Sequence, residues 1–239
     1  MKEKNIIVSG ASSGIGRAIS TRLLQQGYRV TGLARDFSKF PCDDQQFTPV
    51  PMDLSDLDEL PARLDTLINK DSIADGLICC AGSGRFGSLE EFSPAQIREL
   101  LDLNLTSQLY LVRALLPGMK QRGSGNIVFM GSEAALAGGK RGAVYSAAKF
   151  GLRGLAQALR QECAASGLRV SIINPGMVKT EFFNELDFRP GAATDNYILP
   201  EDVALAVQLV LEAREGTVFD EINLSPQKKV IRFPKPGAD

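Results

Sequence analysis

The stretch that decides the fold is Asn5-Ile6-Ile7-Val8-Ser9-Gly10-Ala11-Ser12-Ser13-Gly14-Ile15-Gly16. Its first four residues form an apolar run that predicts a buried strand. The amphipathic pattern from Arg17 to Gln26, which stops at Gly27, predicts a helix directly after the turn. Glycines let the turn bend tightly and let a pyrophosphate approach the main chain at the helix N-terminus. We therefore expect a nucleotide site here, although the spacing is GxxxGxG rather than GxGxxG and a glycine-rich turn is often only a turn.

Further strand-like and helical segments alternate along the rest of the chain. Strands are expected at 28–34, 47–52, 76–82, 126–130, 168–173 and 221–224. Helices are expected after a Ser55 cap, with Pro61 delaying the start, from Pro94 to about Leu116, around Tyr145 to Ala165, and at 201–213. This alternation predicts an α/β, three-layer, doubly wound Rossmann-type fold with a parallel sheet of about seven strands. With 239 residues, we expect one catalytic domain over 1–239, with a possible substrate lid at 177–197.

Composition excludes several classes of protein. A formal net charge of −1 and a pI near 5.7 argue against nucleic-acid or membrane partners. Because Met1-Lys2-Glu3-Lys4 runs directly into the first strand, we expect no signal peptide and a soluble, cytoplasmic protein. The four cysteines show no metal-ligand spacing and are expected to be free thiols. The chain contains no histidine, which excludes serine-histidine-aspartate hydrolases and histidine metal sites, and we expect no metal.

Tyr145 and Lys149 are the candidate acid/base pair. Their spacing of four residues on a predicted helix places both side chains on one face. A phenol titrates near ~10 in water, and a neighbouring ammonium in a partly dry cleft is expected to lower its pKa by two or three units. Ser132 lies thirteen residues upstream, and Asn104 interrupts the apolar stripe of the helix that begins at Pro94. The alternative is a surface tyrosine and lysine on an ordinary amphipathic helix.

The end of the second strand predicts which dinucleotide binds. Arg35 follows Ala34 there, and Arg17 lies just beyond the glycine turn, so the two guanidiniums are expected to converge on a 2′-phosphate. NADP is therefore favoured as the cofactor. Asp36 leaves NAD open, because its carboxylate can pair with Arg35 or accept a ribose hydroxyl. Asp53 either faces the adenine or forms a simple strand-end turn.

These residues together resemble the short-chain dehydrogenase/reductase family over nearly the whole chain. The motifs appear in family order: Gly10, Gly14 and Gly16; Asp53-Leu54; Ala81-Gly82; Asn104; Ser132; Tyr145 with Lys149; and Pro175-Gly176 followed by Thr180. The resemblance implies that Ser132 orients the substrate oxygen, Tyr145 transfers its proton, Lys149 lowers the tyrosine pKa and holds the nicotinamide ribose, and Asn104 holds a relay water. It implies a dimer or tetramer. The implied cofactor-binding residues are Gly10, Ser12, Ser13, Gly14, Ile15, Gly16, Arg17, Arg35, Asp53, Leu54, Ala81, Gly82, Asn104, Tyr145, Lys149, Pro175, Gly176, Val178 and Thr180.

Two departures from the family pattern affect the cofactor floor. Ser9 replaces the usual threonine but keeps a hydroxyl, whereas Cys79-Cys80 replaces paired asparagines and loses their hydrogen bonds. We interpret the two thiols as small core residues. The carboxyl-terminal third looks like the subgroup that acts on 3-hydroxy acids and related small alcohols. The expected activity is NADP(H)-dependent interconversion of a secondary alcohol and a carbonyl; a dinucleotide-sensing protein without turnover and a sugar-nucleotide epimerase are the alternatives.

Overall fold

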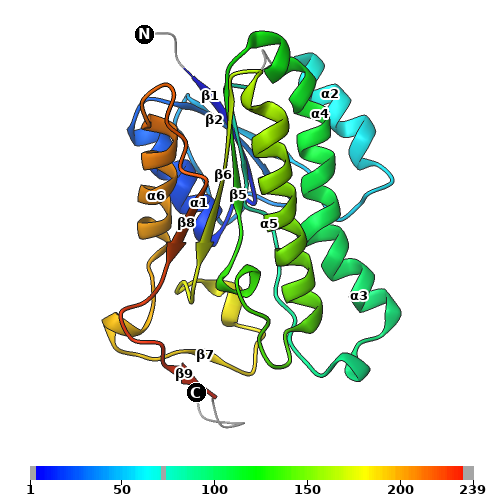
Figure 1. Cartoon of the computed structure of the whole chain (residues 1–239), viewed down its shortest axis with the longest axis vertical. Coiled ribbons are helices and arrows are strands. Elements are labelled where there is room, and N and C mark those ends of the chain that lie inside the picture. The colour runs from blue at the N-terminus through cyan, green and yellow to red at the C-terminus, as the bar shows by residue number, and fades with distance from the viewer. Residues whose placement is uncertain (1–3, 71–73, 234–239) are drawn as a thin grey trace.

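Seven parallel strands form the central sheet, in the order β3-β2-β1-β4-β5-β6-β8 (Figure 1). The structure is a computed structural model that describes residues 4–70 and 74–233; Met1 to Glu3, on which the expectation of no signal peptide partly rests, lie outside that range. The predicted Rossmann-type sheet is confirmed. Its strands are β1 (Asn5–Ser9), β2 (Arg29–Ala34), β3 (Phe47–Pro51), β4 (Gly76–Cys79), β5 (Gly125–Met130), β6 (Leu168–Pro175) and β8 (Glu221–Leu224).

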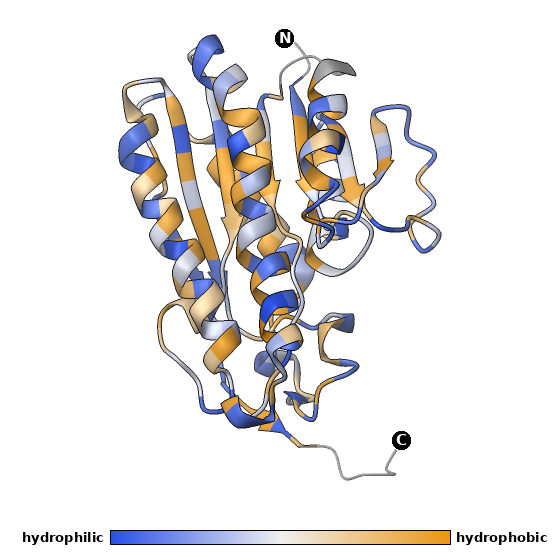
Figure 2. Ribbon diagram, turned by 90° about the vertical axis from the view of Figure 1, so that its right-hand side faces the viewer, coloured by the Kyte–Doolittle hydropathy of each residue, from blue (hydrophilic) through white to orange (hydrophobic). Residues whose placement is uncertain are grey.

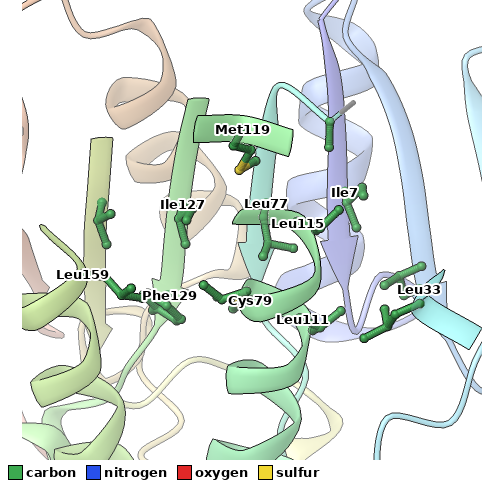
Figure 3. Packing of buried hydrophobic residues seen from close by; sticks show 14 of the residues in the cluster. Ile7, Leu33, Leu77, Cys79, Leu111, Leu115, Met119, Ile127, Phe129 and Leu159 are labelled. Carbon is green, nitrogen blue, oxygen red and sulfur yellow. The ribbon is translucent and has the colours of Figure 1, made fainter. Parts of the chain in front are cut away.

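Helices cover both faces of this sheet and give the fold three layers. Helices α1 (Gly14–Gln25) and α6 (Pro200–Glu212) pack on one face. Helices α2 (Leu60–Lys70), α4 (Ser107–Arg122) and α5 (Ala143–Ala164) pack on the other. Successive strand residues point to opposite faces. Ile127 and Phe129 of β5 accordingly join the core beneath α4 and α5, as Figure 3 shows, whereas Val128 joins the core beneath α1 and α6.

The strands are mainly hydrophobic, with single polar residues among them, and the helices carry polar residues on the side away from the sheet (Figure 2). In β1, all five residues are buried. Such continuous apolar strands are expected of a parallel sheet that is covered on both faces. Within the described residues, no helix is both long and apolar enough to cross a membrane.

The helix expected from Pro94 to about Leu116 is interrupted, so that prediction was wrong in detail. Helix α3 (Pro94–Leu101) passes into one π-helical segment, Asp102–Thr106, before α4 begins. Asn104 lies inside this segment, and its Nδ2 donates to the Leu100 carbonyl oxygen over 2.9 Å. An inserted side-chain hydrogen bond of this kind opens a helix, and π-segments of this type are frequent at functional sites.

Two further details differ from expectation. Ser55 does not cap α2: its N–H and hydroxyl both donate to the Asp53 carboxylate, and the helix begins only at Leu60. The second is a two-stranded antiparallel sheet formed by β7 (Arg189–Pro190) and β9 (Ile231–Arg232), below the carboxyl ends of the main strands in Figure 1. The sequence offered no strand pattern in either of these short segments, so their pairing was not predicted.

The strand order reverses direction between β1 and β4, which is the switch point where ligands bind in open α/β sheets. The residues that follow these two strands lie against each other. A Cβ added at Gly10 would meet the Ala81 Cα at 3.0 Å. The fold therefore places the glycine turn, Ala81 and Gly82 at the position that the Rossmann topology reserves for a ligand.

Candidate active site

A continuous cleft of about 920 Å³ opens at the carboxyl ends of the strands. It brings together most of the predicted site residues: Gly10, Ser13, Gly14, Ile15, Gly16, Ala81, Gly82, Asn104, Ser132, Tyr145, Lys149, Pro175, Gly176, Val178 and Thr180. Five predicted residues do not line it: Ser12, Arg17, Arg35, Asp53 and Leu54. Leu54 is a core side chain that is 4% exposed.

The glycine turn is shaped so that no side chain fills it. Gly10 and Gly14 have φ values of 70° and 48°, a region that L side chains rarely adopt. A Cβ at Gly16 would lie 2.1 Å from the Gly10 carbonyl oxygen. The Ser13 hydroxyl makes no capping hydrogen bond to the start of α1, which leaves the first amides of that helix to another acceptor. This main-chain cradle at a helix N-terminus fits a pyrophosphate.

Ser9 connects the glycine turn to the exit of β4. Its Oγ accepts hydrogen bonds from the N–H groups of Cys80, over 2.9 Å, and Ala81, over 3.1 Å. Gln108 supports the same exit by donating to the Ala81 carbonyl oxygen over 3.1 Å. The hydroxyl retained at Ser9 therefore braces the cofactor floor even without the asparagine pair of the family pattern.

The two neighbouring thiols have different positions. Cys79 is buried in the core beneath α4, as expected, whereas Cys80 lines the cleft. Burial raises the pKa of the Cys80 thiol to about 12, although the Lys149 charge acts in the opposite direction, and burial also raises the pKa of Cys79. Both groups are thus protonated thiols at neutral pH, and both are free.

Arg35 and Asp53 lie near each other at the ends of β2 and β3. Burial alone would raise the pKa of Asp53, but hydrogen bonds from Ser55 and the charges of Arg35 and Arg63 lower it overall. Asp53 therefore occupies a strand-end turn, one of its two predicted roles. The Asp36 carboxylate accepts hydrogen bonds from the Ser38 N–H and hydroxyl, which turns it toward Ser38.

Arg17 lies on α1, directly after the glycine turn. It lines a depression of about 460 Å³ between α1 and α6, together with Arg22, Lys179 and Glu201. This depression adjoins the cleft, because Gly14, Thr180 and Glu181 line both. Arg35 is exposed at the end of β2. The convergence of the two guanidiniums on a 2′-phosphate stays a prediction.

Tyr145 and Lys149 lie on one face of α5, as the spacing predicts, and both are nearly buried, with exposed fractions of 8% and 5%. The Lys149 Nζ lies 5.7 Å from the centre of the Tyr145 ring and donates a hydrogen bond to the Met130 carbonyl oxygen over 3.0 Å. Ser132 follows Met130 at the end of β5, and its side chain is hydrogen-bonded to that of Tyr145. The serine, tyrosine and lysine therefore meet in one cleft.

The expected lowering of the tyrosine pKa is not found. Burial raises the pKa of Tyr145 to about 12; hydrogen bonding with Ser132 lowers it and the Glu133 charge raises it further. Burial likewise lowers the pKa of Lys149 to about 8. The sequence-based expectation weighed the charge of the neighbouring ammonium and left out the desolvation of the phenol, which is the larger effect here.

Asn104 has a polar atom that faces the cleft region without a partner. Its Nδ2 donates to the Leu100 and Ser83 carbonyl oxygens, but among the described residues its buried Oδ1 has no hydrogen-bond partner. This oxygen lies close to Gly82: a Cβ there would meet it at 2.6 Å and the Lys149 Nζ at 3.7 Å. A buried acceptor of this kind ordinarily binds water or a ligand.

The turn after β6 lies against the glycine turn. Thr180 lies over Gly14, where an added Cβ would be 3.4 Å from the threonine Cβ. Its Oγ1 accepts a hydrogen bond from the Phe182 N–H and so begins the short helix η4 (Glu181–Phe183). Val178 forms a bridge to Ile198. Pro175, Gly176, Val178 and Thr180 are thus placed along one wall.

Several lining residues were not named individually from the sequence, although four of them lie in the predicted lid at 177–197. They are Phe86, Glu133, Leu136, Lys140, Arg141, Phe182, Phe183, Asp187, Phe188, Lys229, Ile231 and Phe233. The only available signal was the mixed aromatic and acidic composition of the predicted lid. No such signal marks Lys229, Ile231 and Phe233, because their position in the cleft depends on the pairing of β9 with β7.

Comparison with known proteins agrees with this geometry. The family model described as short chain dehydrogenase matches residues 4–189. An uncharacterized oxidoreductase of Staphylococcus epidermidis is 31% identical over 230 residues, covering 95% of this chain and 98% of the relative. The 3-ketodihydrosphingosine reductase of Mus musculus is 30% identical over 236 residues, covering 91% of this chain and 70% of the relative.

Solved structures share the fold at lower identity. ElxO with NADP bound has a TM-score of 0.82 at 21% identity, covering 94% of this chain and 98% of that chain. The 4-hydroxyisoleucine dehydrogenase complexed with NADH has a TM-score of 0.84 at 23% identity, with the same coverage of 94% and 98%. Proteins with this fold are therefore found with either dinucleotide.

Proposed function

The chain is an oxidoreductase of the short-chain dehydrogenase/reductase family, and from that premise we propose that it interconverts a carbonyl compound and a secondary alcohol with NADP(H). The observation that carries the proposal is the meeting of Ser132, Tyr145 and Lys149 in the cleft that begins at the glycine turn. When bound, the nicotinamide supplies or accepts the hydride.

Each of these residues has a role that follows from its position. Tyr145 is protonated at neutral pH because burial raises its pKa, so its hydroxyl is available as the acid that gives a proton to the carbonyl oxygen during reduction. Ser132, hydrogen-bonded to Tyr145, is placed to hold the same substrate oxygen. The positive charge of Lys149 lies beside the tyrosine ring and stabilises the phenolate that is left after proton transfer.

Asn104 is proposed to complete a proton path. Its unpartnered Oδ1 and the Lys149 Nζ both lie beside Gly82. A water molecule accepting from the lysine and donating to the amide oxygen would satisfy both groups and link the buried lysine to solvent. The π-segment at Asp102–Thr106 holds the amide in that position.

NADP rather than NAD is proposed because of the charges at the end of β2. Arg35 is exposed there, and the Asp36 carboxylate is committed to Ser38 rather than free to accept a ribose hydroxyl. A guanidinium binds a phosphate with paired hydrogen bonds. The glycine cradle, Ala81, Gly82 and the turn Pro175–Thr180 would hold the remainder of the cofactor.

The test is a screen for NADPH oxidation with ketones, aldehydes, keto esters and keto acids, repeated with NADH. We expect turnover with NADPH for at least one carbonyl class, and loss of nearly all turnover in Tyr145→Phe with cofactor binding retained. Full activity of Tyr145→Phe would refute the assigned role. Tight NADPH binding without turnover on any carbonyl would favour a dinucleotide-sensing protein instead.

A homo-oligomer is also proposed. Large apolar side chains are exposed on the outer faces of the helices: Leu109 on α4, Phe150 on α5, and Leu205 and Leu209 on α6. Apolar groups on two separate faces support a dimer or a tetramer rather than a monomer. Light scattering at micromolar concentration would distinguish these states.

A further inference from the structure

The substrate end of the cleft is walled by five aromatic rings in a closed circuit. Ring centroids lie 5.2 Å apart for Tyr145 and Phe86, 5.0 Å for Phe86 and Phe188, and 5.8 Å for Phe188 and Phe183. The circuit closes through Phe182, 5.3 Å from Phe183 and 6.1 Å from Tyr145. These separations and the tilted or edge-on ring planes are those of favourable aromatic pairs. We call these five residues the aromatic wall.

The aromatic wall is held in place by the backbone around it. Phe182 packs against Gly84, where an added Cβ would lie 2.2 Å from the Phe182 ring. Phe86 packs against Gly142, with an added Cβ 3.5 Å from its ring. All four phenylalanines are partly exposed and line the cleft. They therefore present a preformed apolar surface beside the tyrosine, and Phe86 and Phe182 are also anchored against the buried cluster of Leu100, Val144 and Tyr145.

The cations on the rim of the cleft are largely neutralised. Arg141 pairs with Asp187, with 3.1 Å between Nη1 and Oδ2, and lies 3.7 Å from a Glu91 oxygen. Lys229 pairs with Glu133 over 2.8 Å. Lys140, the remaining rim cation, is exposed. A carboxylate on the substrate would therefore have to displace a carboxylate of the protein or pair with Lys140 alone.

Two further large apolar side chains line the cleft. Ile231, in β9, and Phe233, directly after it, are 44% and 70% exposed. Side chains this large and apolar are seldom left in water without a binding role when they gather in one cleft. The cleft thus offers apolar surface beyond the aromatic wall itself.

We propose that the aromatic wall binds the apolar body of a neutral ketone or aldehyde, an alkyl chain of several carbons or an aryl group, and that the site disfavours small carboxylate-bearing substrates. The inference rests on the proposed function, because it places the substrate carbonyl at Tyr145 and Ser132. It departs from the small hydroxy acid that the carboxyl-terminal sequence pattern suggested.

The test compares methyl ketones from butanone to decanone with keto acids of matched carbon number, with NADPH as the reductant. We expect kcat/KM to rise about three- to fourfold for each added methylene that reaches the aromatic wall, the usual effect of burying one methylene. Keto acids are expected to be poorer than the ketones of equal length. No rise with chain length, or a preference for the acids, would overturn the inference.

Substitutions at Phe188 test whether the dependence of kcat/KM on chain length arises at the aromatic wall. Phe188→Asn should lower kcat/KM for decanone by about tenfold or more while changing that for butanone little, and Phe188→Leu should lose less because it remains apolar. Leu89→Asn changes an exposed apolar side chain that does not line the cleft and should leave the series unchanged. An unaltered chain-length series in Phe188→Asn, in protein with a wild-type melting curve, would contradict the assignment; Phe183→Leu repeats the test at the neighbouring ring.

Binding measurements separate this inference from the proposed function. Calorimetric titration of decanone and of its matched keto acid into Tyr145→Phe saturated with NADPH needs no turnover. Tighter binding of the ketone supports the aromatic wall as an apolar subsite, and tighter binding of the acid rejects it. An absence of turnover by the wild-type protein on every carbonyl would reject the proposed function, and the titration would still decide the subsite.

Discussion

The Lys149 Nζ lies 5.7 Å from the centre of the Tyr145 ring, while its hydrogen bond goes to the Met130 carbonyl oxygen. The lysine charge therefore lies beside the tyrosine ring, and its hydrogen bond goes to the main chain rather than to the phenol. The charge is itself conditional, because burial lowers the pKa of Lys149 to about 8. The presence of a positive charge beside the Tyr145 ring thus depends on the protonation of Lys149.

This dependence predicts a pH profile. The kcat/KM for NADPH reports groups of the free enzyme, so it should fall as pH rises through about 8, where Lys149 loses its proton. The titration of Tyr145 should cause no further change in kcat/KM below pH 10, because its pKa is raised to about 12. Steady-state rates between pH 6 and pH 10 measure this. A profile that stays flat to pH 10 would show that the lysine charge is not required.

Lys149→Met should stabilise the fold at neutral pH. In the unfolded chain the lysine keeps its proton up to its ordinary pKa of 10.5, but in the folded protein it loses it near pH 8. Between these values the unfolded chain binds more protons, so the wild-type fold gains stability as pH rises. Below pH 8 the full cost of the buried charge is present, and we expect the variant to be more stable by roughly 1–3 kcal/mol after loss of the Met130 hydrogen bond.

Urea unfolding of both proteins at pH 7 and at pH 10 measures this difference. The advantage of the methionine variant should shrink at the higher pH. A variant less stable than wild type at pH 7 would mean that the buried ammonium stabilises the fold.

Arg35→Ala should weaken the use of NADPH selectively. Losing a charge-assisted hydrogen bond to a phosphate costs about 1.5–3 kcal/mol, which corresponds to a ten- to hundredfold rise in the KM for NADPH. The KM for NADH should change little. Arg29→Ala is the matched control, because that exposed arginine stands at the opposite end of β2. Equal losses with both dinucleotides, or a larger effect at Arg29, would count against the proposed 2′-phosphate site.

Ser9→Ala should destabilise the protein and Ser9→Thr should not. The Ser9 hydroxyl accepts from two main-chain N–H groups at the exit of β4, and alanine would leave both without this partner. The expected loss is roughly 1–3 kcal/mol in the free energy of unfolding. Thermal unfolding of the two variants measures it. Equal stability of wild type and Ser9→Ala would show that water replaces the hydroxyl at no cost.

What the sequence could predict was what local spacing determines. The strand-turn-helix with Gly10, Gly14 and Gly16 is specified within twelve residues, and the four-residue spacing of Tyr145 and Lys149 fixes their common face. The alternation of segments then gives the parallel sheet and places every loop that carries a motif at the same edge.

What the sequence could not predict depends on distant contacts or on burial. Phe86 meets Phe188, about a hundred positions away along the chain, only after the loops after β4 and β6 have folded together. The pairing of Pro190 with Ile231 has no strand-like pattern on either side. The sign of the tyrosine pKa shift follows from desolvation, which no spacing reveals. The π-segment at Asn104 is an exception, because its hydrogen bond to Leu100 is local but no spacing pattern marks it.

The glycine turn and the end of β2 differ in how many amino-acid substitutions they tolerate. At Gly16 even a methyl group would collide with the Gly10 carbonyl oxygen at 2.1 Å, so this turn is closed to variation. Arg35 and Asp36 are exposed at the end of β2, where new side chains disturb no packing. If Arg35 holds the 2′-phosphate, as proposed, descendants of this protein or variants made in the laboratory can exchange one dinucleotide for the other at the strand end while the glycine turn is inherited unaltered.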